Sequence, residues 1–141
     1  MSAHNRDSVQ RHYASDANLR IRQETHDKYT VPQVDYVDWC LSAHQWRGDE
    51  RVLDLGCGPG LYARKLLDRY PKLDYYGFDL LPAMLSNHPA RQRTAIADAV
   101  QIPFASASFD LVMANHVLHH IEDVPTVLSE MRRVLKPDGI L

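Results

Sequence analysis

The sequence has 141 residues, of which 45% are apolar and 24% charged, and its formal net charge is −2. This length and composition suit one globular domain with a single core. The nearly balanced charge, with Lys and Arg scattered along the chain, gives no electrostatic reason to expect nucleic acid as a partner.

The sequence shows no targeting or membrane-spanning segment. Residues 1–16 are polar, unlike a secretory signal peptide, and no run approaches the roughly 18 apolar residues that a membrane span needs. The two cysteines, Cys40 and Cys57, lie in different predicted elements, which favours reduced thiols over a disulfide. We therefore expect a cytoplasmic protein without a membrane span.

Residues 1–48 are predicted to be mainly helical. Thr30 and Gln33 have the spacing of a capping box, with Pro32 in the first turn of the helix. Apolar residues then recur at helical spacing, at Val34, Val37, Cys40 and Leu41. A second helix is predicted over residues 19–26, where Arg22 and His26 lie four positions apart on one face.

From residue 51 the pattern changes to strands alternating with helices. The predicted strands cover residues 52–55, 75–78, 94–97 and 109–114. This alternation indicates βαβ units, a parallel sheet and helices on both of its faces. Residues 136–139 are predicted to form a turn after the last helix, with Ile140 and Leu141 as the first residues of a fifth strand.

The strongest functional signal is the glycine-rich turn from Asp54 to Gly60, between the first strand and a helix. Glycines at 56, 58 and 60 let the backbone bend tightly and approach a ligand closely. The helix that follows presents unpaired N–H groups to electron-rich ligand atoms. The alternative interpretation is a strand-to-helix turn without a ligand.

Asp79 is the second signal, 19 residues after Gly60 at the end of the second predicted strand. A carboxylate there can accept hydrogen bonds from ribose hydroxyls. Alone, an Asp at a strand end is usually a turn or cap residue. In register with the glycine-rich turn, it predicts a ribose site.

The spacing of the glycines separates two classes of cofactor. Dinucleotide sites favour G-x-G-x-x-G, whereas this chain has G-x-G-x-G preceded by Asp54. A carboxylate beside the loop repels a pyrophosphate but suits a ligand with an ammonium and a sulfonium group. The pattern favours S-adenosylmethionine over a nicotinamide cofactor.

Residues 52–60, 97–112 and 135–141 together resemble class I S-adenosylmethionine-dependent methyltransferases of the small-molecule, type 11 branch. The resemblance implies a Rossmann-like, three-layer α/β/α fold with parallel strand order 3-2-1-4 and with the family's remaining strands missing. Residues 49–141 would form a partial cofactor-binding domain, and residues 1–48 a helical cap or lid. S-adenosyl-L-methionine would be the cofactor and a small molecule the methyl acceptor.

The resemblance also implies roles for individual residues. Asp79 would bind the ribose hydroxyls, and Leu80 would flank the adenine. Asp98 would accept from the adenine amino group, Ala99 would offer its backbone N–H to the ring, and Asn115 would lie at the methionine end. The other implied cofactor contacts are Asp54, Gly56, Cys57, Gly58, Gly60 and, from the lid, Arg22.

The sequence does not single out a general base. Methyl transfer needs one only where the acceptor must lose a proton, and the candidates are His116, His119, Tyr13 and His26. His116, His119 and His120 lie close together, but no Cys or carboxylate accompanies them at ligand spacing, so no metal site is expected. Cys57 lacks an obvious base and is expected to be structural.

Two other functions stay open at this point. One is a nucleotide-cofactor oxidoreductase, and the other is a non-catalytic or vestigial cofactor-binding fragment with an incomplete sheet. A sheet that stops at Leu141 would expose the fourth strand as an edge without Pro or Lys to protect it. We therefore expect the 141-residue chain to be poorly soluble, to pair through that strand, or to exist only as part of a longer protein.

Overall fold

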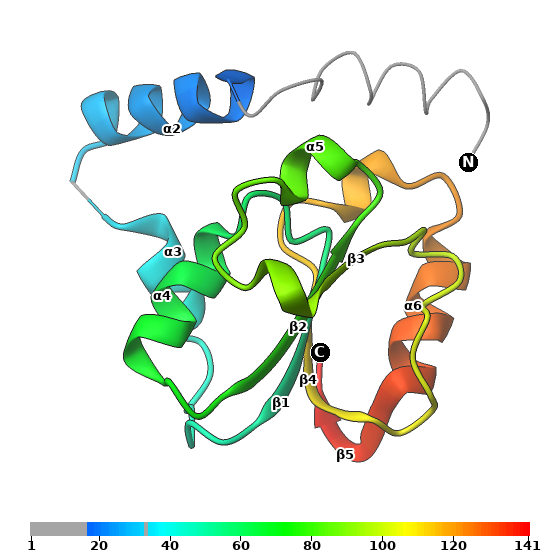
Figure 1. The fold of residues 1–141 in the computed structure, drawn as a ribbon. Coiled ribbons are helices and arrows are strands. Elements are labelled where there is room, and N and C mark those ends of the chain that lie inside the picture. The colour runs from blue at the N-terminus through cyan, green and yellow to red at the C-terminus, as the bar shows by residue number, and fades with distance from the viewer. Residues whose placement is uncertain (1–16, 33) are drawn as a thin grey trace.

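The structure is a computed structural model that describes residues 17–32 and 34–141. In this part of the chain, a five-stranded parallel sheet has the order β3-β2-β1-β4-β5 (Figure 1). The predicted α/β class and the order of the first four strands are confirmed. The strands are β1 (Arg51–Leu55), β2 (Asp74–Asp79), β3 (Thr94–Ile96), β4 (Phe109–Met113) and β5 (Leu135–Ile140).

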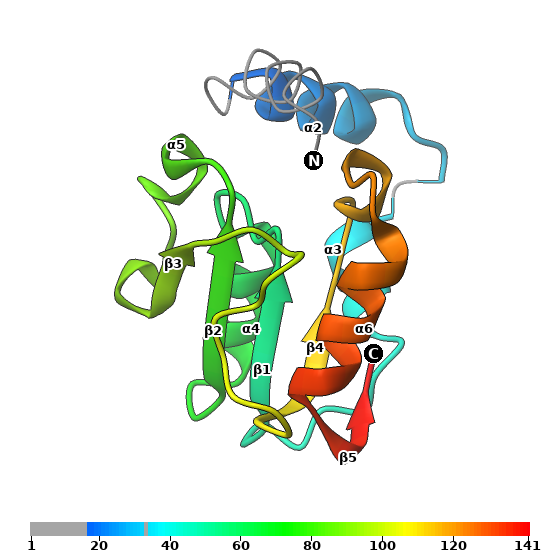
Figure 2. The same ribbon diagram turned by 90° about the vertical axis from the view of Figure 1, so that its right-hand side faces the viewer.

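Helices cover both faces of the sheet, as in a three-layer fold. Helices α3 and α4 pack on one face and α6 packs on the other, as the two views agree (Figures 1 and 2). The described helices are α2 (Ala17–Tyr29), α3 (Tyr36–Leu41), α4 (Leu61–Arg69), α5 (Pro82–Leu85) and α6 (Val124–Val134), with 3-10 turns η1 (Arg91–Arg93) and η2 (Leu118–His120).

Strand β1 lies at the centre and is apolar because both of its faces are covered. Val52 and Leu53 are completely buried and belong to the cores on opposite faces, as the alternation of a strand requires. The register of β1 with β2 runs from Arg51 beside Asp74 to Leu55 beside Phe78. Both strands therefore end at the same edge, where open parallel sheets bind ligands.

The ends of α6 show how local sequence sets a helix. Asp123 caps the N-terminus, since its carboxylate accepts the Thr126 N–H at 3.0 Å. The buried residues of α6 are Val127, Met131 and Val134, which lie three or four positions apart and face the sheet. This helix closes the second layer behind the cavity described below.

Residues 136–139 belong to strand β5, so the predicted turn is wrong. Strand β5 pairs with β4 from Phe109–Leu135 to Leu111–Ile140, with a shift of register between the two pairs. Pro137 is tolerated because an edge strand has N–H positions that need no partner. Strand β4 has β1 and β5 as neighbours, so the prediction that it is an exposed edge is wrong. Self-association through β4 therefore loses its structural basis.

The start of α3 also differs from the prediction. The helix begins at Tyr36 and not near Thr30, because Asp35 is its N-cap and accepts the Asp38 N–H at 3.0 Å. Asp35 directly precedes Tyr36 and is therefore closer than Thr30 to the first turn of the helix. The predicted upstream helix is present as α2 and extends to Tyr29.

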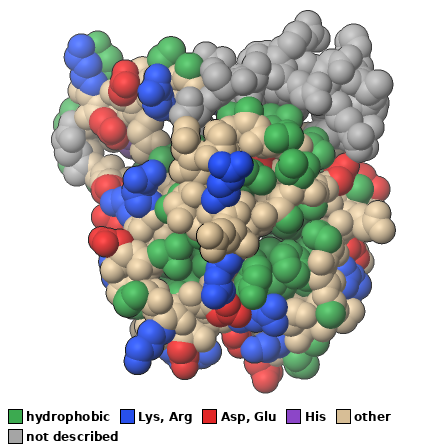
Figure 3. All heavy atoms as spheres, viewed as in Figure 1, with side chains coloured by type: hydrophobic (Ala, Val, Ile, Leu, Met, Phe, Trp, Pro, Cys, Tyr) green, Lys and Arg blue, Asp and Glu red, His purple; other side chains and the backbone are tan. Residues whose placement is uncertain are grey.

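Two properties of the surface bear on partners. Among residues 17–32 and 34–141, no helix is long and apolar enough to span a bilayer. On the face seen in Figure 3, basic and acidic side chains are interspersed and do not gather into a patch of one sign.

Candidate functional site

The glycine-rich turn leaves β1 at the ligand-binding edge of the sheet. Gly56, Gly58 and Gly60 have φ values of 68°, 54° and 80°, a left-handed conformation that glycine adopts without strain. The N–H groups of Gly56 and Cys57 both donate to the Phe78 carbonyl, at 2.9 and 3.0 Å. The turn is therefore fastened to the end of β2.

Gly56 and Gly58 have opposite surroundings. A Cβ on Gly56 would lie 2.5 Å from Val117 Cγ2, whereas a Cβ on Gly58 would have no heavy atom within 4 Å. Gly56 is thus needed for packing against the loop after β4. Gly58 instead faces open space, as a residue that contacts a ligand through its backbone should.

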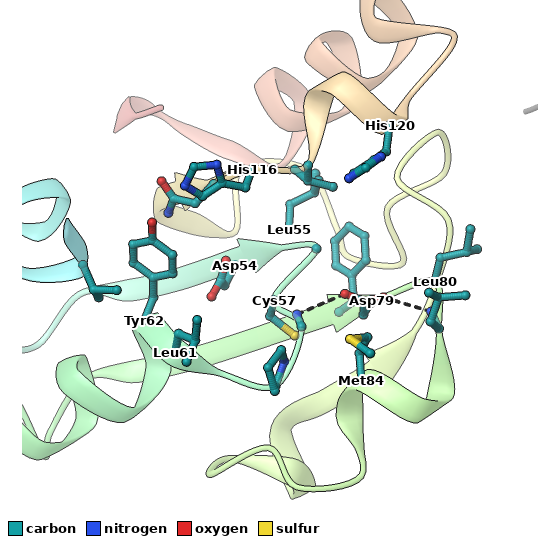
Figure 4. Close-up of a pocket in the computed structure, with 18 of the residues that line it drawn as sticks. Asp54, Leu55, Cys57, Leu61, Tyr62, Asp79, Leu80, Met84, His116 and His120 are labelled. Carbon is teal, nitrogen blue, oxygen red and sulfur yellow. Dashed lines mark hydrogen bonds between the residues drawn. The ribbon is translucent and has the colours of Figure 1, made fainter. Parts of the chain in front are cut away.

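Each carboxylate oxygen of Asp79 accepts a hydrogen bond from a backbone N–H group. Its Oδ2 accepts the Gly58 N–H at 3.0 Å and its Oδ1 accepts the Leu81 N–H at 2.9 Å (dashed lines in Figure 4). Burial raises the pKa of this carboxyl, and the N–H donors of Leu81 and Gly58 oppose that rise. A carboxylate has about four lone-pair positions, so each oxygen can still accept from a ligand hydroxyl.

Asp54 ends up almost completely buried at the base of the turn, with 2% of its surface exposed. Burial raises its pKa to about 7, against the effect of the Tyr75 hydroxyl, which donates to Asp54 Oδ2 at 2.9 Å. The charge of Asp79 raises the pKa further. A cation placed beside Asp54 would restore its ionised form.

Cys57 packs into the same region and is not poised as a nucleophile. Its thiol is buried, and burial together with the charges of Asp54 and Asp79 raises its pKa far above the usual range. A thiol that stays protonated is a poor nucleophile. This agrees with the structural role expected for Cys57.

A cavity of about 570 Å³ opens above these groups, within the usual range for small-molecule sites. Its lining residues come from segments that lie far apart in the sequence, between α2 and the loop after β4. The predicted site residues that line it are Arg22, His26, Asp54, Gly56, Cys57, Gly58, Asp79, Leu80, Asp98, Ala99, Asn115, His116 and His119.

Two predicted site residues fall outside that lining. Gly60 is the N-cap of α4, and a Cβ there would lie 2.8 Å from His88 Nε2, so its role in this structure is to allow close packing. Tyr13 lies outside the described residues.

The mouth of the cavity is covered from α2 and the start of α3. The Tyr36 ring lies 6.2 Å from the His26 ring and 5.3 Å from the His116 ring, measured between centroids. These contacts join α2 and the start of α3 to the loop after β4. They place Arg22 and His26 on the cavity that contains the glycine-rich turn, while the division of the chain into a lid and a domain stays a prediction.

The structure adds lining residues that the sequence did not predict as site residues. Tyr36, Leu61, Tyr62, Met84 and His120 all line the cavity. His120 was visible as a member of the histidine cluster, and Figure 4 shows it with His116 across the cavity from Asp79. The others sit at ordinary helical positions, and no local pattern distinguishes them from core residues.

Tyr62 has a polar atom that the protein leaves unsatisfied. Its side chain is 8% exposed, and its hydroxyl is buried with no hydrogen-bond partner among the described residues. Figure 4 shows the ring beside Asp54 with the hydroxyl pointing toward the loop that carries His116. Buried hydroxyls normally have partners, so this atom fits a ligand in the cavity.

The polar side chains of the cavity come from strand ends and from the loop after β4. Three carboxylates, Asp54, Asp79 and Asp98, follow the ends of strands or precede the turns there, and imidazoles lie on the loop after β4. In the part of the chain that the structure describes, no three His, Cys, Asp or Glu side chains meet as a metal site.

Comparison with known proteins identifies the family. The model of the Methyltransf_11 family, described as a methyltransferase domain, matches residues 53–141. The malonyl-[acyl-carrier protein] O-methyltransferase of Legionella pneumophila is 40% identical over 97 residues, which are 64% of this chain and 34% of that protein. An uncharacterized methyltransferase of Mycobacterium bovis is 35% identical over 75% of this chain and 55% of its own length.

Solved structures agree on the fold. The YcgJ protein of Bacillus subtilis superimposes with a TM-score of 0.64 at 28% identity, over 73% of this chain and 47% of that one. A phosphoethanolamine N-methyltransferase of Haemonchus contortus, bound to S-adenosylhomocysteine, gives a TM-score of 0.78 over 96% of this chain and 34% of its own. At 24% identity, this second likeness concerns the fold alone.

The chain spans about a third of the length of the first two curated relatives it matches, both malonyl-[acyl-carrier protein] O-methyltransferases. Its glycine-rich turn, the carboxylates beside it and the strand order are those expected of the class I fold. The chain belongs to the Methyltransf_11 family of class I methyltransferase domains, whose cofactor is S-adenosylmethionine.

Proposed function

We propose that this chain binds S-adenosylmethionine across the carboxyl ends of β1, β2 and β4, and that it acts in transferring the methyl group to an acceptor. The observation that carries the proposal is the bond from the Gly58 N–H to Asp79 beside a cavity. It would present an anchored carboxylate and the backbone of Gly58, which has no side chain, to the same ligand.

The residues present fit this cofactor. The remaining lone pairs of Asp79 would accept the two ribose hydroxyls, and Asp54 would face the ammonium group. The apolar side chains of Leu80 and Met84 line the cavity, where they would contact the adenine. The unpartnered Tyr62 hydroxyl would gain a polar neighbour.

The bound sulfonium would supply a methyl group that is already activated for transfer. The protein's task is then to hold the acceptor in line at short distance. Tyr36, between His26 and His116, would cover the mouth of the cavity and reduce the access of water. Asp54 and Asp79 would fix the cofactor from the opposite side.

Relatives suggest the class of acceptor. Two of them, 40% and 43% identical to this chain, are named for O-methyl transfer to malonyl-[acyl-carrier protein]. We propose a small carboxylate, free or carried on a protein, as the acceptor. A carboxylate is ionised at neutral pH and needs no base to attack, so His116, His119 and His26 would orient it and would not remove a proton.

Two measurements test the proposal. Thermal unfolding should shift upward with excess S-adenosylhomocysteine and not with NAD⁺; a shift with NAD⁺ alone would support the oxidoreductase alternative. Label from methyl-labelled S-adenosylmethionine should then pass to a malonyl thioester. Cofactor binding without transfer to any carboxylate offered would reject this class of acceptor and favour the non-catalytic alternative.

A further inference from the structure

A chain of hydrogen bonds leads to Asp54 from beneath the cavity. The Ala90 N–H donates to His88 Nδ1 at 3.0 Å, His88 Nε2 lies 3.3 Å from Tyr75 Oη, and Tyr75 Oη donates to Asp54 Oδ2 at 2.9 Å. The rings of Tyr75 and His88 also stack, with centroids 5.7 Å apart. Neither ring lines the cavity, and Tyr75 interacts with two residues that do, Asp54 and Cys57.

The first bond sets the direction of the others. Because Nδ1 accepts from the backbone, a neutral His88 carries its proton on Nε2 and donates to the Tyr75 oxygen. Burial lowers the pKa of His88 to about 4, which keeps the ring neutral at physiological pH. Tyr75 then directs its own proton to Asp54, and every donor in the chain points toward the carboxylate.

This arrangement is buried and depends on two glycines. Asp54, Tyr75 and His88 are 2%, 0% and 4% exposed. A Cβ on Gly77 would lie 2.9 Å from Tyr75 Oη, and one on Gly60 would lie 2.8 Å from His88 Nε2. The last glycine of the turn thus packs on the same imidazole that orients Tyr75. Buried polar networks are costly unless every member has its partner.

The other ionisable groups around Asp54 do not replace this donor. Asp79, also on β2, opposes ionisation of Asp54 by its charge. Cys57 and Tyr62, from the turn and from α4, have pKa values raised by burial and remain neutral. The Tyr75 hydroxyl is therefore the neighbouring side chain that favours the carboxylate form.

We propose that Tyr75 and His88 are positioning residues that favour the carboxylate form of Asp54 and orient it to receive the ammonium group of the cofactor. This inference rests on the proposed function and adds two residues that do not touch the ligand. The Tyr75 hydroxyl donates a hydrogen bond to the Asp54 carboxylate. His88 does not contact Asp54 directly; it donates to the Tyr75 oxygen and so directs the Tyr75 proton toward Asp54.

The pH dependence of binding follows from this arrangement. Asp54 has a pKa of about 7 in the ligand-free protein, and an ammonium group binds its ionised form. Affinity should therefore rise as the pH increases through about 7 and then level off. Removing the Tyr75 donor raises the pKa of Asp54 further, which moves this midpoint to higher pH.

Calorimetric titration with S-adenosylhomocysteine between about pH 5.5 and pH 8 tests the proposal. Tyr75→Phe should weaken binding at least about tenfold at neutral pH, the loss expected for a hydrogen bond to a charged group, and should move the midpoint upward. Tyr76→Phe is the matched control, since it removes a hydroxyl from the next residue on the opposite face of β2.

His88 provides a second, independent pair of variants. His88→Leu removes the donor to Tyr75 and should weaken binding in the same direction by a smaller factor. His88→Gln, whose amide nitrogen can occupy the place of Nε2, should restore it. This pair keeps the test decisive if Tyr75→Phe does not fold, which thermal unfolding of each variant would reveal.

The outcomes separate the two proposals. Equal affinity and an equal pH midpoint for wild type and Tyr75→Phe, or equal binding by His88→Leu and His88→Gln, overturns the positioning role. Absence of binding by wild type and Tyr76→Phe at every pH overturns the proposed function itself. Weaker binding without a shift of the midpoint would indicate a packing role and would also reject the positioning role.

Discussion

The Gly58 N–H donates to Asp79 Oδ2 at 3.0 Å, across 21 positions of sequence. This bond joins the glycine-rich turn to the end of β2 and aims both at the same cavity. Because the turn and Asp79 hold each other in place, the glycine spacing and the strand-end carboxylate together predict a ligand site better than either does alone.

Alanine at Gly58 and at Gly56 should have different effects. Gly58→Ala places a methyl group in open space at a φ of 54°, so it should cost roughly 1–2 kcal/mol of stability from strain and should block the cofactor. Gly56→Ala drives the methyl into Val117 and should destabilise the fold more. Chemical denaturation and S-adenosylhomocysteine titration of both variants check this. Equal stability loss in the two would contradict the different surroundings described here.

Asp54→Asn should stabilise the ligand-free protein while weakening cofactor binding. The raised pKa of Asp54, about 7, means that the native state keeps a proton which the unfolded state has lost above about pH 4. Stability from this group therefore falls as the pH rises from about 4 to 7, and the variant should avoid that fall, by roughly 2–4 kcal/mol at pH 8.

Urea unfolding of both proteins at pH 5 and pH 8 measures this difference. His88 titrates in both, with a lowered pKa that acts in the opposite direction, so only the difference between the proteins reports Asp54. A stability difference that does not change with pH would show that Asp54 is not the buried acid described here.

Tyr62→Phe should leave stability unchanged or raise it slightly, by up to about 1 kcal/mol, because the variant loses a hydroxyl that has no partner in the ligand-free protein. The same change should weaken S-adenosylhomocysteine binding if that hydroxyl meets the ligand. Thermal unfolding and titration of the same preparation measure both effects. Unchanged affinity would place the ligand away from Tyr62.

Tyr36→Ala should open the cavity without unfolding the sheet. The ring contacts His26 and His116 and is 38% exposed, so its loss removes the link between α2 and the loop after β4. We expect cofactor dissociation to accelerate by roughly tenfold, as for the loss of one aromatic contact pair. Stopped-flow displacement measures the rate, with Tyr29→Ala as a control that removes an exposed aromatic ring from the end of α2.

The sequence predicted the parts of the fold that depend on local pattern. The alternation of strands and helices and the turn from Asp54 to Gly60 follow from periodicity and glycine placement, whereas the order of the first four strands was implied by the resemblance to the methyltransferase family. The predictions failed where tertiary context decides. Pro137 and Gly139 indicate a turn, but pairing with β4 makes them an edge strand.

The site residues that lie at strand ends could be predicted from the sequence. The contacts between side chains that are far apart in the sequence could not. Asp54 and Asp79 could be placed from their positions at the carboxyl ends of two parallel strands. The contact of Asp54 with Tyr75 spans 21 positions, and that of Tyr75 with His88 spans 13, with no motif connecting them. Tyr36 was likewise hidden, because its helix starts at the Asp35 cap and not at Thr30.

The most direct test of the account is calorimetric titration of S-adenosylhomocysteine into the wild-type chain and into Asp79→Ala. Asp74→Ala is the control, since this residue lies at the other end of β2 and pairs with Arg51 on the surface. We predict one site per chain, wild-type affinity in the control, and at least about tenfold weaker binding in Asp79→Ala. Equal affinity in all three proteins would contradict the ribose role of Asp79, and no binding by any would contradict the central claim.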